Sequence, residues 1–143
     1  MRAAVDALWA ELAGRGVSWL GFYLLARDAE RGDEMVLGPR RDKPACSPIG
    51  MHGACGRCCR SGRPMVVRDV ASLGAGYIAC DPRDRSEVVL PTLGSDGACW
   101  GVLDLDSFDV GAFDENDIHG LQAVLEAAGL TTPQDWRGRI DSY

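Results

Sequence analysis

The chain has 143 residues, of which 46% are hydrophobic and 25% charged, and its formal net charge at pH 7 is −6. These values describe one folded domain of ordinary size and exclude a disordered chain. Its basic residues are scattered, which argues against a nucleic-acid partner, and no segment approaches the roughly 20 apolar residues that a bilayer requires. Because the N-terminus also lacks the apolar core of a signal peptide, we expect a cytoplasmic protein without a membrane partner.

The first part of the chain predicts a helix, two strands and a loop. Apolar residues recur with helical spacing over residues 1–14, at Val5, Leu8, Trp9 and Leu12. Residues 17–26 are apolar on both faces, as in a central strand, and residues 34–39 form a second strand after a charged turn. Residues 40–54 lack periodicity and contain two prolines and two glycines, which favours a long functional loop.

The second part predicts further strands between two helices. A short helix is expected at 55–62, followed by strands at 64–70, 86–93 and 98–107, with residues 71–77 as a loop. Asp114 and Gly129 have the positions of helix caps around a terminal helix. The sequence therefore predicts one α+β domain over residues 1–143, with a core at 17–130, a mostly antiparallel central sheet flanked by helices, and a C-terminal extension at 131–143.

Two carboxylates share one face of the strand at 98–107. Because side chains alternate along a strand, Asp104 and Asp106 point to the same side, about 7 Å apart, while Leu103 and Cys99 take the other side and enter the core. Two like charges so close in a partly dry pocket raise the pKa of at least one carboxyl group, which can then donate a proton. The alternative is a solvated edge strand.

Three residues of the strand at 17–26 also share a face, namely Trp19, Gly21 and Tyr23. The glycine leaves a notch between two aromatic rings, which suits a small apolar group such as a methyl or thioether. The alternative is ordinary core packing of the two rings.

Six cysteines are present, and in a reducing compartment they indicate metal binding, redox chemistry or packing. Cys80 lies at a turn near Arg83 and Arg85, whose charges favour a reactive thiolate. Cys46 lies in the irregular loop, and Cys55 at a helix start, where the helix dipole favours thiolate. Residues 55–58 read C-x-x-C, but a redox or zinc role for that motif needs a βαβ unit or a second paired motif. For Cys58 and Cys59, packing and reactivity both stay open.

Several short motifs occur together in a fixed order, and together they are far more specific than any one alone. They read "WLGFYLL", "LGP", "KPAC", "GACG", "IACD", "SEVVLP", "GVLDLDS" and "FDENDIHGL". In this order they span Ser18 to Leu130, and the chain resembles the free methionine-R-sulfoxide reductases, which are built on a GAF domain.

The resemblance implies a catalytic cysteine at Cys80, a cysteine that forms a disulfide with it at Cys46, and an accessory resolving cysteine at Cys55. It assigns substrate binding to two aromatic and three acidic residues, Trp19, Tyr23, Glu87, Asp104 and Asp106. The implied reaction reduces free methionine-R-sulfoxide through a sulfenic acid and a disulfide, which thioredoxin or another dithiol recycles.

The family further implies a homodimer with no bound cofactor or metal. Pro48 stands where the family has a basic residue, and Cys58 and Cys59 are additional thiols. These thiols are interpreted either as further resolving cysteines or as the mark of another oxidised substrate. The competing hypothesis is a GAF module that binds a small ligand or senses redox state without catalysis.

Overall fold

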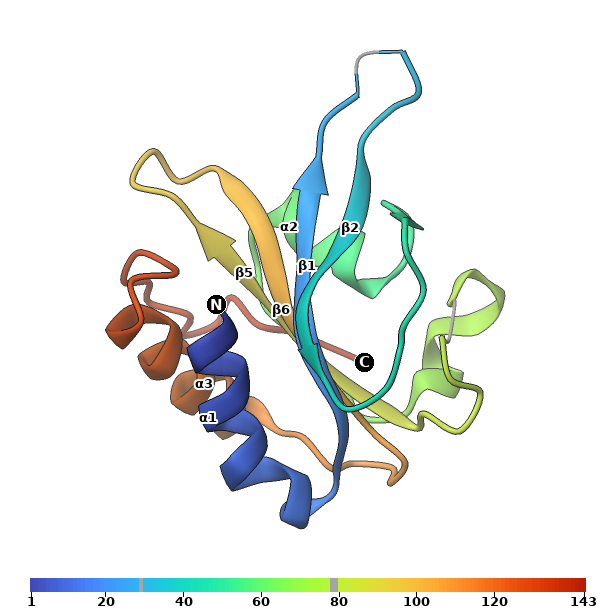
Figure 1. The fold of residues 1–143 in the computed structure, drawn as a ribbon. Helices are drawn as coiled ribbons and strands as arrows, with labels where there is room; N and C mark the ends of the chain where they lie inside the picture. Colours follow the sequence, from blue (N-terminus) through green and yellow to red (C-terminus); the bar gives the residue numbers. More distant parts are fainter. Residues whose placement is uncertain (29, 78–79) are drawn as a thin grey trace.

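A computed structural model describes residues 1–28, 30–77 and 80–143 and contains a sheet of seven strands (Figure 1). Their order across the sheet is β3-β2-β1-β6-β5-β4-β7, and every pair is antiparallel except β4 and β7. The strands are β1 (Val17–Ala26), β2 (Glu34–Arg41), β3 (Ile49–Gly50), β4 (Met65–Val67), β5 (Ser86–Leu93), β6 (Cys99–Ser107) and β7 (Asp141–Ser142). The expected α+β domain with a mostly antiparallel sheet is confirmed.

Helices cover both faces of this sheet. Helices α1 (Arg2–Leu12) and α3 (Glu115–Ala127) lie side by side on one face, and α2 (Ala54–Ser61) lies on the other (Figure 1). Two 3-10 helices complete the fold, η1 (Ala13–Arg15) and η2 (Val70–Gly76). The strand predicted at 64–70 is therefore shorter, and the loop predicted at 71–77 is largely the helix η2. Residues 78 and 79 of the "IACD" motif lie outside the described residues.

The face beneath α1 and α3 is a dry apolar core. Alternate residues of β1, β5 and β6 point into it and are almost fully buried: Leu20, Phe22, Val88, Leu90, Leu103 and Leu105. Their partners across the sheet are in register, as in the pair of Leu20 with Leu105. Burial of these side chains is the main stabilising contribution that the sequence pattern supplies.

Local signals set both ends of α3 as the sequence predicts. The Asp114 side chain accepts a hydrogen bond of 2.7 Å from the backbone N–H of Asn116, and Asp117 accepts one of 2.8 Å from the backbone of Asp114. This reciprocal pair is a capping box. Gly129 follows the helix with a φ of 65°, which is the left-handed conformation that ends helices.

The C-terminal segment is packed against the domain. Trp136 is buried, and its indole N–H donates a hydrogen bond of 3.0 Å to Gln122 of α3. Beyond it, β7 adds a parallel strand next to β4. The sequence did not indicate this strand, because two residues are too few for a pattern of alternation.

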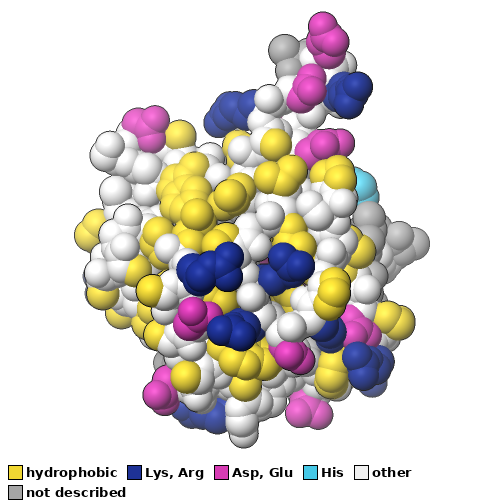
Figure 2. Space-filling view, viewed as in Figure 1, with side chains coloured by type: hydrophobic (Ala, Val, Ile, Leu, Met, Phe, Trp, Pro, Cys, Tyr) yellow, Lys and Arg dark blue, Asp and Glu magenta, His cyan; other side chains and the backbone are white. Residues whose placement is uncertain are grey.

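Charged side chains of both signs are interspersed on the face formed by α1 and α3, and the protruding β1–β2 hairpin carries both signs at its tip (Figure 2). This arrangement differs from the basic stripe of a nucleic-acid-binding surface. Within the described ranges, no helix is both long and apolar enough to span a membrane.

Candidate active site

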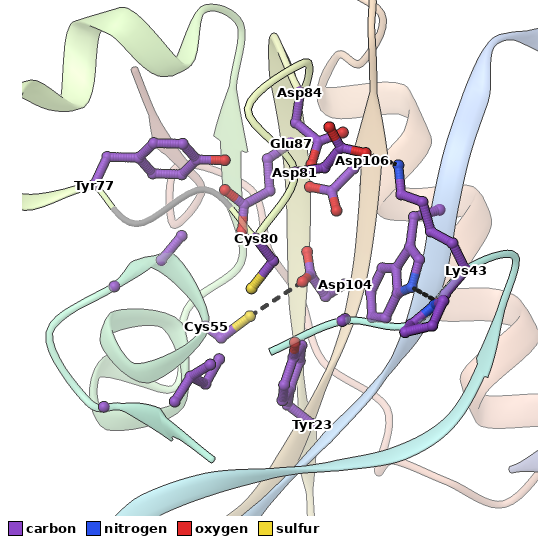
Figure 3. A pocket seen from close by; sticks show the side chains of 17 residues that line it. Tyr23, Lys43, Cys55, Tyr77, Cys80, Asp81, Asp84, Glu87, Asp104 and Asp106 are labelled. Atoms are coloured by element: carbon purple, nitrogen blue, oxygen red, sulfur yellow. Dashed lines mark hydrogen bonds and ion pairs between the residues drawn. The ribbon is translucent and has the colours of Figure 1, made fainter. Parts of the chain in front are cut away.

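A pocket with a volume of about 100 Å³ opens on the α2 face of the sheet (Figure 3). Strands β1, β5 and β6 form its floor, and the loops before α2 and β5 form its walls. Seven of the eight predicted site residues line it: Trp19, Tyr23, Cys55, Cys80, Glu87, Asp104 and Asp106. The eighth, Cys46, contacts Cys80. Strand register brings the floor together, because Asp106 pairs with Trp19 on one side and with Glu87 on the other.

Three carboxyl groups converge in this pocket, and burial raises the pKa of each. The pKa of Asp104 is raised to about 7, chiefly because the group is removed from water. Glu87 has a pKa well above its usual range, first from burial and then from the charge and hydrogen bond of Asp104. The pKa of Asp106 is also raised, first by burial and then by its two acidic neighbours. At neutral pH the cluster therefore holds protons that it can donate.

Cys55 reaches the carboxyl cluster from the first turn of α2. Its thiol donates a hydrogen bond of 3.3 Å to Asp104 Oδ2 (Figure 3). Burial and the negative charges of Asp104 and Glu87 raise the pKa of this thiol well above its usual range. The expectation that the helix dipole favours a Cys55 thiolate is therefore wrong for the ligand-free protein, because desolvation and two carboxylates outweigh a helix of only eight residues.

Cys80 lies at the mouth of the pocket, with its sulfur directed inward (Figure 3). Its neighbours are the thiol and the backbone of Cys46 and the hydroxyl group of Tyr23. The Tyr23 hydroxyl also donates to the carbonyl oxygen of Cys46 at 2.9 Å, so one tyrosine positions both cysteines. The resemblance implies a disulfide between these two cysteines, and the structure places them in contact as free thiols.

The arginines after Cys80 do not activate it in the way the sequence suggested. Arg83 forms an ion pair of 2.8 Å with Asp81, and its guanidinium group lies over the Phe108 ring. Partial burial and the Cys46 thiol instead raise the pKa of Cys80 to about 12. The ligand-free protein therefore holds Cys80 as a thiol, and the charge of Arg83 is already paired with Asp81.

The aromatic pair of β1 closes the pocket at the β2 side. The rings of Trp19 and Tyr23 lie 5.9 Å apart, and the Trp19 indole donates a hydrogen bond of 3.0 Å to the carbonyl oxygen of Lys43. The expected notch at Gly21 is not open, because a Cβ atom there would lie only 2.6 Å from the Trp19 ring. Gly21 therefore makes room for the indole itself, and an apolar ligand group would meet the ring.

Four further lining residues with polar side chains were missed in the sequence: Lys43, Tyr77, Asp81 and Asp84. Lys43 forms an ion pair of 2.6 Å with Asp81, and Tyr77 lies beside Glu87. Asp84 is buried and accepts a hydrogen bond of 3.3 Å from Ser18. All four come from loops without periodicity. The only available signals were the place of Lys43 in "KPAC" and the run of acidic residues after Cys80.

One group in the described part of the chain has the spacing of a metal site. Ligand atoms of Cys55, Glu87 and Asp104 lie within 4.8 Å of one another, and one thiol with two carboxyl groups suits a divalent ion such as zinc. All three pKa values are raised, so protons compete for these ligands. A four-cysteine zinc site built on Cys55 and Cys58, the other metal site that the C-x-x-C motif allows, is not among the clusters found in the described residues.

The remaining three cysteines lie outside the pocket. Cys58 is fully buried, and its thiol donates to the carbonyl oxygen of Val89 at 3.7 Å, so it is a packing residue. Cys59 and Cys99 are in contact with each other, with their sulfur atoms 2.6 Å apart. The prediction that Cys99 is a core residue beside Leu103 holds only in part, because Cys99 is partly buried and packs against the apolar clusters on both faces, and its sulfur contacts Cys59. A register shift opposite Leu93 leaves Trp100 as an extra residue, which interrupts the alternation of β6.

Comparison with known proteins identifies the family to which this fold and pocket belong. A model of the GAF domain family matches residues 1–131, so the chain belongs to the GAF domain family. Free methionine-R-sulfoxide reductase from Escherichia coli is 39% identical over 121 residues, which cover 81% of this chain and 68% of that protein. The Saccharomyces cerevisiae enzyme of the same name is 36% identical over 111 residues, which cover 77% of this chain and 60% of that protein.

A solved structure gives the same result in three dimensions. The free methionine-R-sulfoxide reductase from Neisseria meningitidis, in complex with its substrate, superimposes with a TM-score of 0.73 at 38% identity. The match covers 88% of this chain and 73% of that one. Within the GAF domains, the chain therefore belongs to the free methionine-R-sulfoxide reductases, and the resemblance predicted from its motifs is confirmed.

Proposed function

We propose that this protein reduces free L-methionine-R-sulfoxide to L-methionine with Cys80 as the nucleophile. One observation carries the proposal: a cysteine pair, Cys80 and Cys46, stands at the mouth of a pocket whose floor holds three carboxyl groups with raised pKa values. A sulfoxide sulfur is open to attack only when its oxygen is protonated or strongly hydrogen-bonded. The pocket combines such donors with a thiol.

The reaction begins with a hydrogen bond from the carboxyl cluster to the sulfoxide oxygen, and Asp104 is the proposed donor because its pKa of about 7 suits proton transfer at neutral pH. The Cys80 sulfur attacks the sulfoxide sulfur, and its thiol proton returns to the carboxyl cluster in place of the proton that the cluster gave to the sulfoxide oxygen. Oxygen moves from the substrate to Cys80, so methionine leaves and Cys80 becomes a sulfenic acid. The thiolate form is needed only at that moment, and the hydroxyl group of Tyr23 and the N–H of Cys46 stabilise it.

Recycling uses the second thiol. Cys46 attacks the Cys80 sulfenic acid, which forms a disulfide and releases water. A dithiol such as thioredoxin then reduces the disulfide, as expected in a reducing compartment such as the cytoplasm. Cys55 is the proposed accessory resolving thiol because it faces the same pocket. No bound cofactor takes part in these steps.

Substrate recognition follows from the charges in the pocket. A remaining carboxylate among Glu87, Asp104 and Asp106 can hold the α-ammonium group, which a residue inside a peptide lacks. Trp19 and Tyr23 supply the apolar wall for the methyl end. Lys43, already paired with Asp81, is the cation available for the substrate carboxylate in the described part of the pocket.

An assay coupled to thioredoxin, thioredoxin reductase and NADPH tests the proposal. It compares the R and S epimers of free methionine sulfoxide in wild type, in Cys80→Ser and in Cys99→Ser, the matched control outside the pocket. We expect R-selective turnover that Cys80→Ser abolishes and Cys99→Ser retains. Turnover that survives Cys80→Ser would refute the nucleophile, and absence of turnover with both epimers would refute the reaction.

The same preparation distinguishes the other hypotheses. A small ligand that raises the melting temperature without turnover would favour a sensor module. Zinc that copurifies in the absence of chelator, and is lost in Cys55→Ala, would favour a metal site at Cys55, Glu87 and Asp104. Sedimentation tests the homodimer that the family resemblance implies.

A further inference from the structure

Cys59 and Cys99 form a second pair of thiols, separate from the candidate active site. Cys59 lies at the C-terminal half of α2 and Cys99 at the start of β6, and their sulfur atoms are 2.6 Å apart. A disulfide bond is about 2.05 Å long, so the two atoms need to approach by only about half an ångström to form one. Asp104 follows Cys99 by five positions along β6, so the pair lies at most roughly 16 Å along the strand from the carboxyl cluster.

The two thiols have unequal environments. The Cys59 thiol donates its hydrogen bond to the Cys99 sulfur, and this bond is the main reason why the pKa of Cys99 is lowered. Backbone contacts with Gly101 and Thr92 and the charge of Arg27 lower the pKa of Cys99 further, and the Cys99 thiol itself donates a hydrogen bond of 3.0 Å to the carbonyl oxygen of Gly101. The same hydrogen bond, together with burial, raises the pKa of Cys59. Cys99 is therefore the better nucleophile, and Cys59 is its proton donor.

Small molecules can reach the pair from solvent. A shallow hollow on the surface is lined by both cysteines and by Arg27, Met51 and Arg60. Cys99 is only partly buried, and Arg27 supplies a positive charge beside it. Cys58, the adjacent thiol, does not line this hollow and is fully buried.

We propose that Cys59 and Cys99 are a second redox site, in which a hydroperoxide produces a reversible disulfide that fastens α2 to β6. The Cys99 thiolate attacks one peroxide oxygen, the O–O bond breaks, and Cys99 becomes a sulfenic acid as water or an alcohol leaves. Cys59 then attacks the Cys99 sulfur, a disulfide forms, and its thiol proton leaves with the sulfenic oxygen as water. A dithiol reverses the step, because it reduces the Cys59–Cys99 disulfide and is itself oxidised to a disulfide.

The position of the pair gives the disulfide a structural consequence. Helix α2 and strand β6 also carry Cys55 and Asp104, which are joined by a hydrogen bond at the pocket. The pocket end of this contact thus includes a thiol–carboxyl hydrogen bond, and the far end would gain a covalent link. Oxidation closes a loop from residue 59 to residue 99 and restricts the unfolded chain, which stabilises the fold.

Peptide mapping after brief hydrogen peroxide treatment tests the proposal. The starting protein is the Cys46→Ser/Cys80→Ser variant, so that the candidate active site cannot supply the disulfide. We expect one disulfide-linked peptide pair that joins Cys59 to Cys99, accompanied by the loss of two hydrogen atoms and reversed by dithiothreitol. Before oxidation, alkylation of Cys99 should be at least about tenfold faster than that of Cys59.

Stability supplies the second readout. The oxidised protein should melt at least about 5 °C above the reduced protein. Adding Cys99→Ser should remove this difference, and adding Cys58→Ser, the matched control, should keep it. Full alkylation of Cys59 and Cys99 after peroxide, a disulfide that uses Cys58, or equal melting temperatures in both redox states would each overturn the proposal. The mapping needs no substitution at the pair, so a variant that fails to fold leaves the test intact.

Discussion

The two faces of the central sheet differ although the same strands build both. Toward α1 and α3, β6 presents Leu103 and Leu105 to a dry core, and toward α2 it presents Asp104 and Asp106 to a pocket. Residues one position apart thus have opposite roles, since one face lowers the free energy of the fold and the other holds buried acids that raise it. Substitutions at alternate positions of one strand can therefore change stability and chemistry independently.

The largest effect is expected on the pocket face, from Asp104→Asn. An amide can accept the Cys55 hydrogen bond but cannot donate a carboxyl proton, so turnover of the R sulfoxide should fall about 10²- to 10⁴-fold. Steady-state kinetics measure this loss. Asp33→Asn, at an exposed aspartate in the β1–β2 turn, is the matched control and should leave turnover unchanged. Turnover near the wild-type value in Asp104→Asn would exclude this residue as the proton donor.

Leu103→Ala is the corresponding change on the core face. The side chain is fully buried, so its removal should lower the free energy of unfolding by about 2–5 kcal/mol. Urea unfolding measures this value, and turnover per folded molecule should remain within about twofold because the pocket lies across the sheet. The control is Val110→Ala, at a side chain that is 52% exposed, with an expected change below about 0.5 kcal/mol. A large loss of turnover in folded Leu103→Ala would mean that the faces are coupled.

Gly21→Ala tests the close packing beneath the pocket. The added Cβ would lie 2.6 Å from the Trp19 ring and 2.7 Å from Arg40 Cβ, so the indole must move. We expect a loss of about 1–3 kcal/mol in stability and a raised KM. Gly120→Ala on α3, where an added Cβ meets no atom within 4 Å, should instead be neutral or stabilising. Unchanged stability and KM in Gly21→Ala would contradict the indole position.

A smaller effect is expected from pH, which should change the stability that depends on the pocket face. Burial raises the folded-state pKa of Asp104 to about 7, against a usual value near 3.9. The free energy of unfolding is therefore highest, as far as Asp104 is concerned, below about pH 4, where the group is protonated in both the folded and the unfolded state. This stabilisation is lost as the pH rises toward 7. Relative to Asp104→Asn, which does not titrate there, wild type should therefore lose a few degrees of melting temperature between pH 5 and pH 8. A constant difference between the two proteins would contradict the raised pKa.

The smallest effect is expected from Arg83→Gln. The guanidinium group is exposed and already paired with Asp81, so the rate of Cys80 alkylation should change by less than about twofold. Stopped-flow alkylation at pH 8 measures that rate. A tenfold decrease would restore the interpretation that the arginines after Cys80 activate it.

Strand periodicity explains which parts of this molecule the sequence predicts. Alternation alone placed Asp104 and Asp106 on one face and Leu103 on the other, and the limits of β1 and β5 agree with the predicted ranges. The roles assigned to Cys46, Cys55 and Cys80 came from the family resemblance and stay predictions, although the structure gathers all three at one pocket.

What the sequence could not predict depends on contacts between distant segments or on breaks in periodicity. Lys43, Tyr77 and Asp84 reach the pocket from loops, whose course is set by tertiary packing. A bulge at Trp100 interrupts the alternation of β6, and the Cys99 sulfur contacts Cys59. The pKa of Cys80 also escaped prediction, because nearness of Arg83 in sequence says nothing about the Asp81 carboxylate that binds it.

The alternation of β6 also limits how the gene can vary in length. Deleting a single residue between Trp100 and Leu103 would slide the rest of the strand by one position and reverse its sides. Both aspartates would then face α1 and α3, and two leucines would fill the pocket. Insertions and deletions should therefore be confined to hairpin tips, such as residues 28–33 and 94–98, where added chain leaves the register of β1, β5 and β6 unchanged.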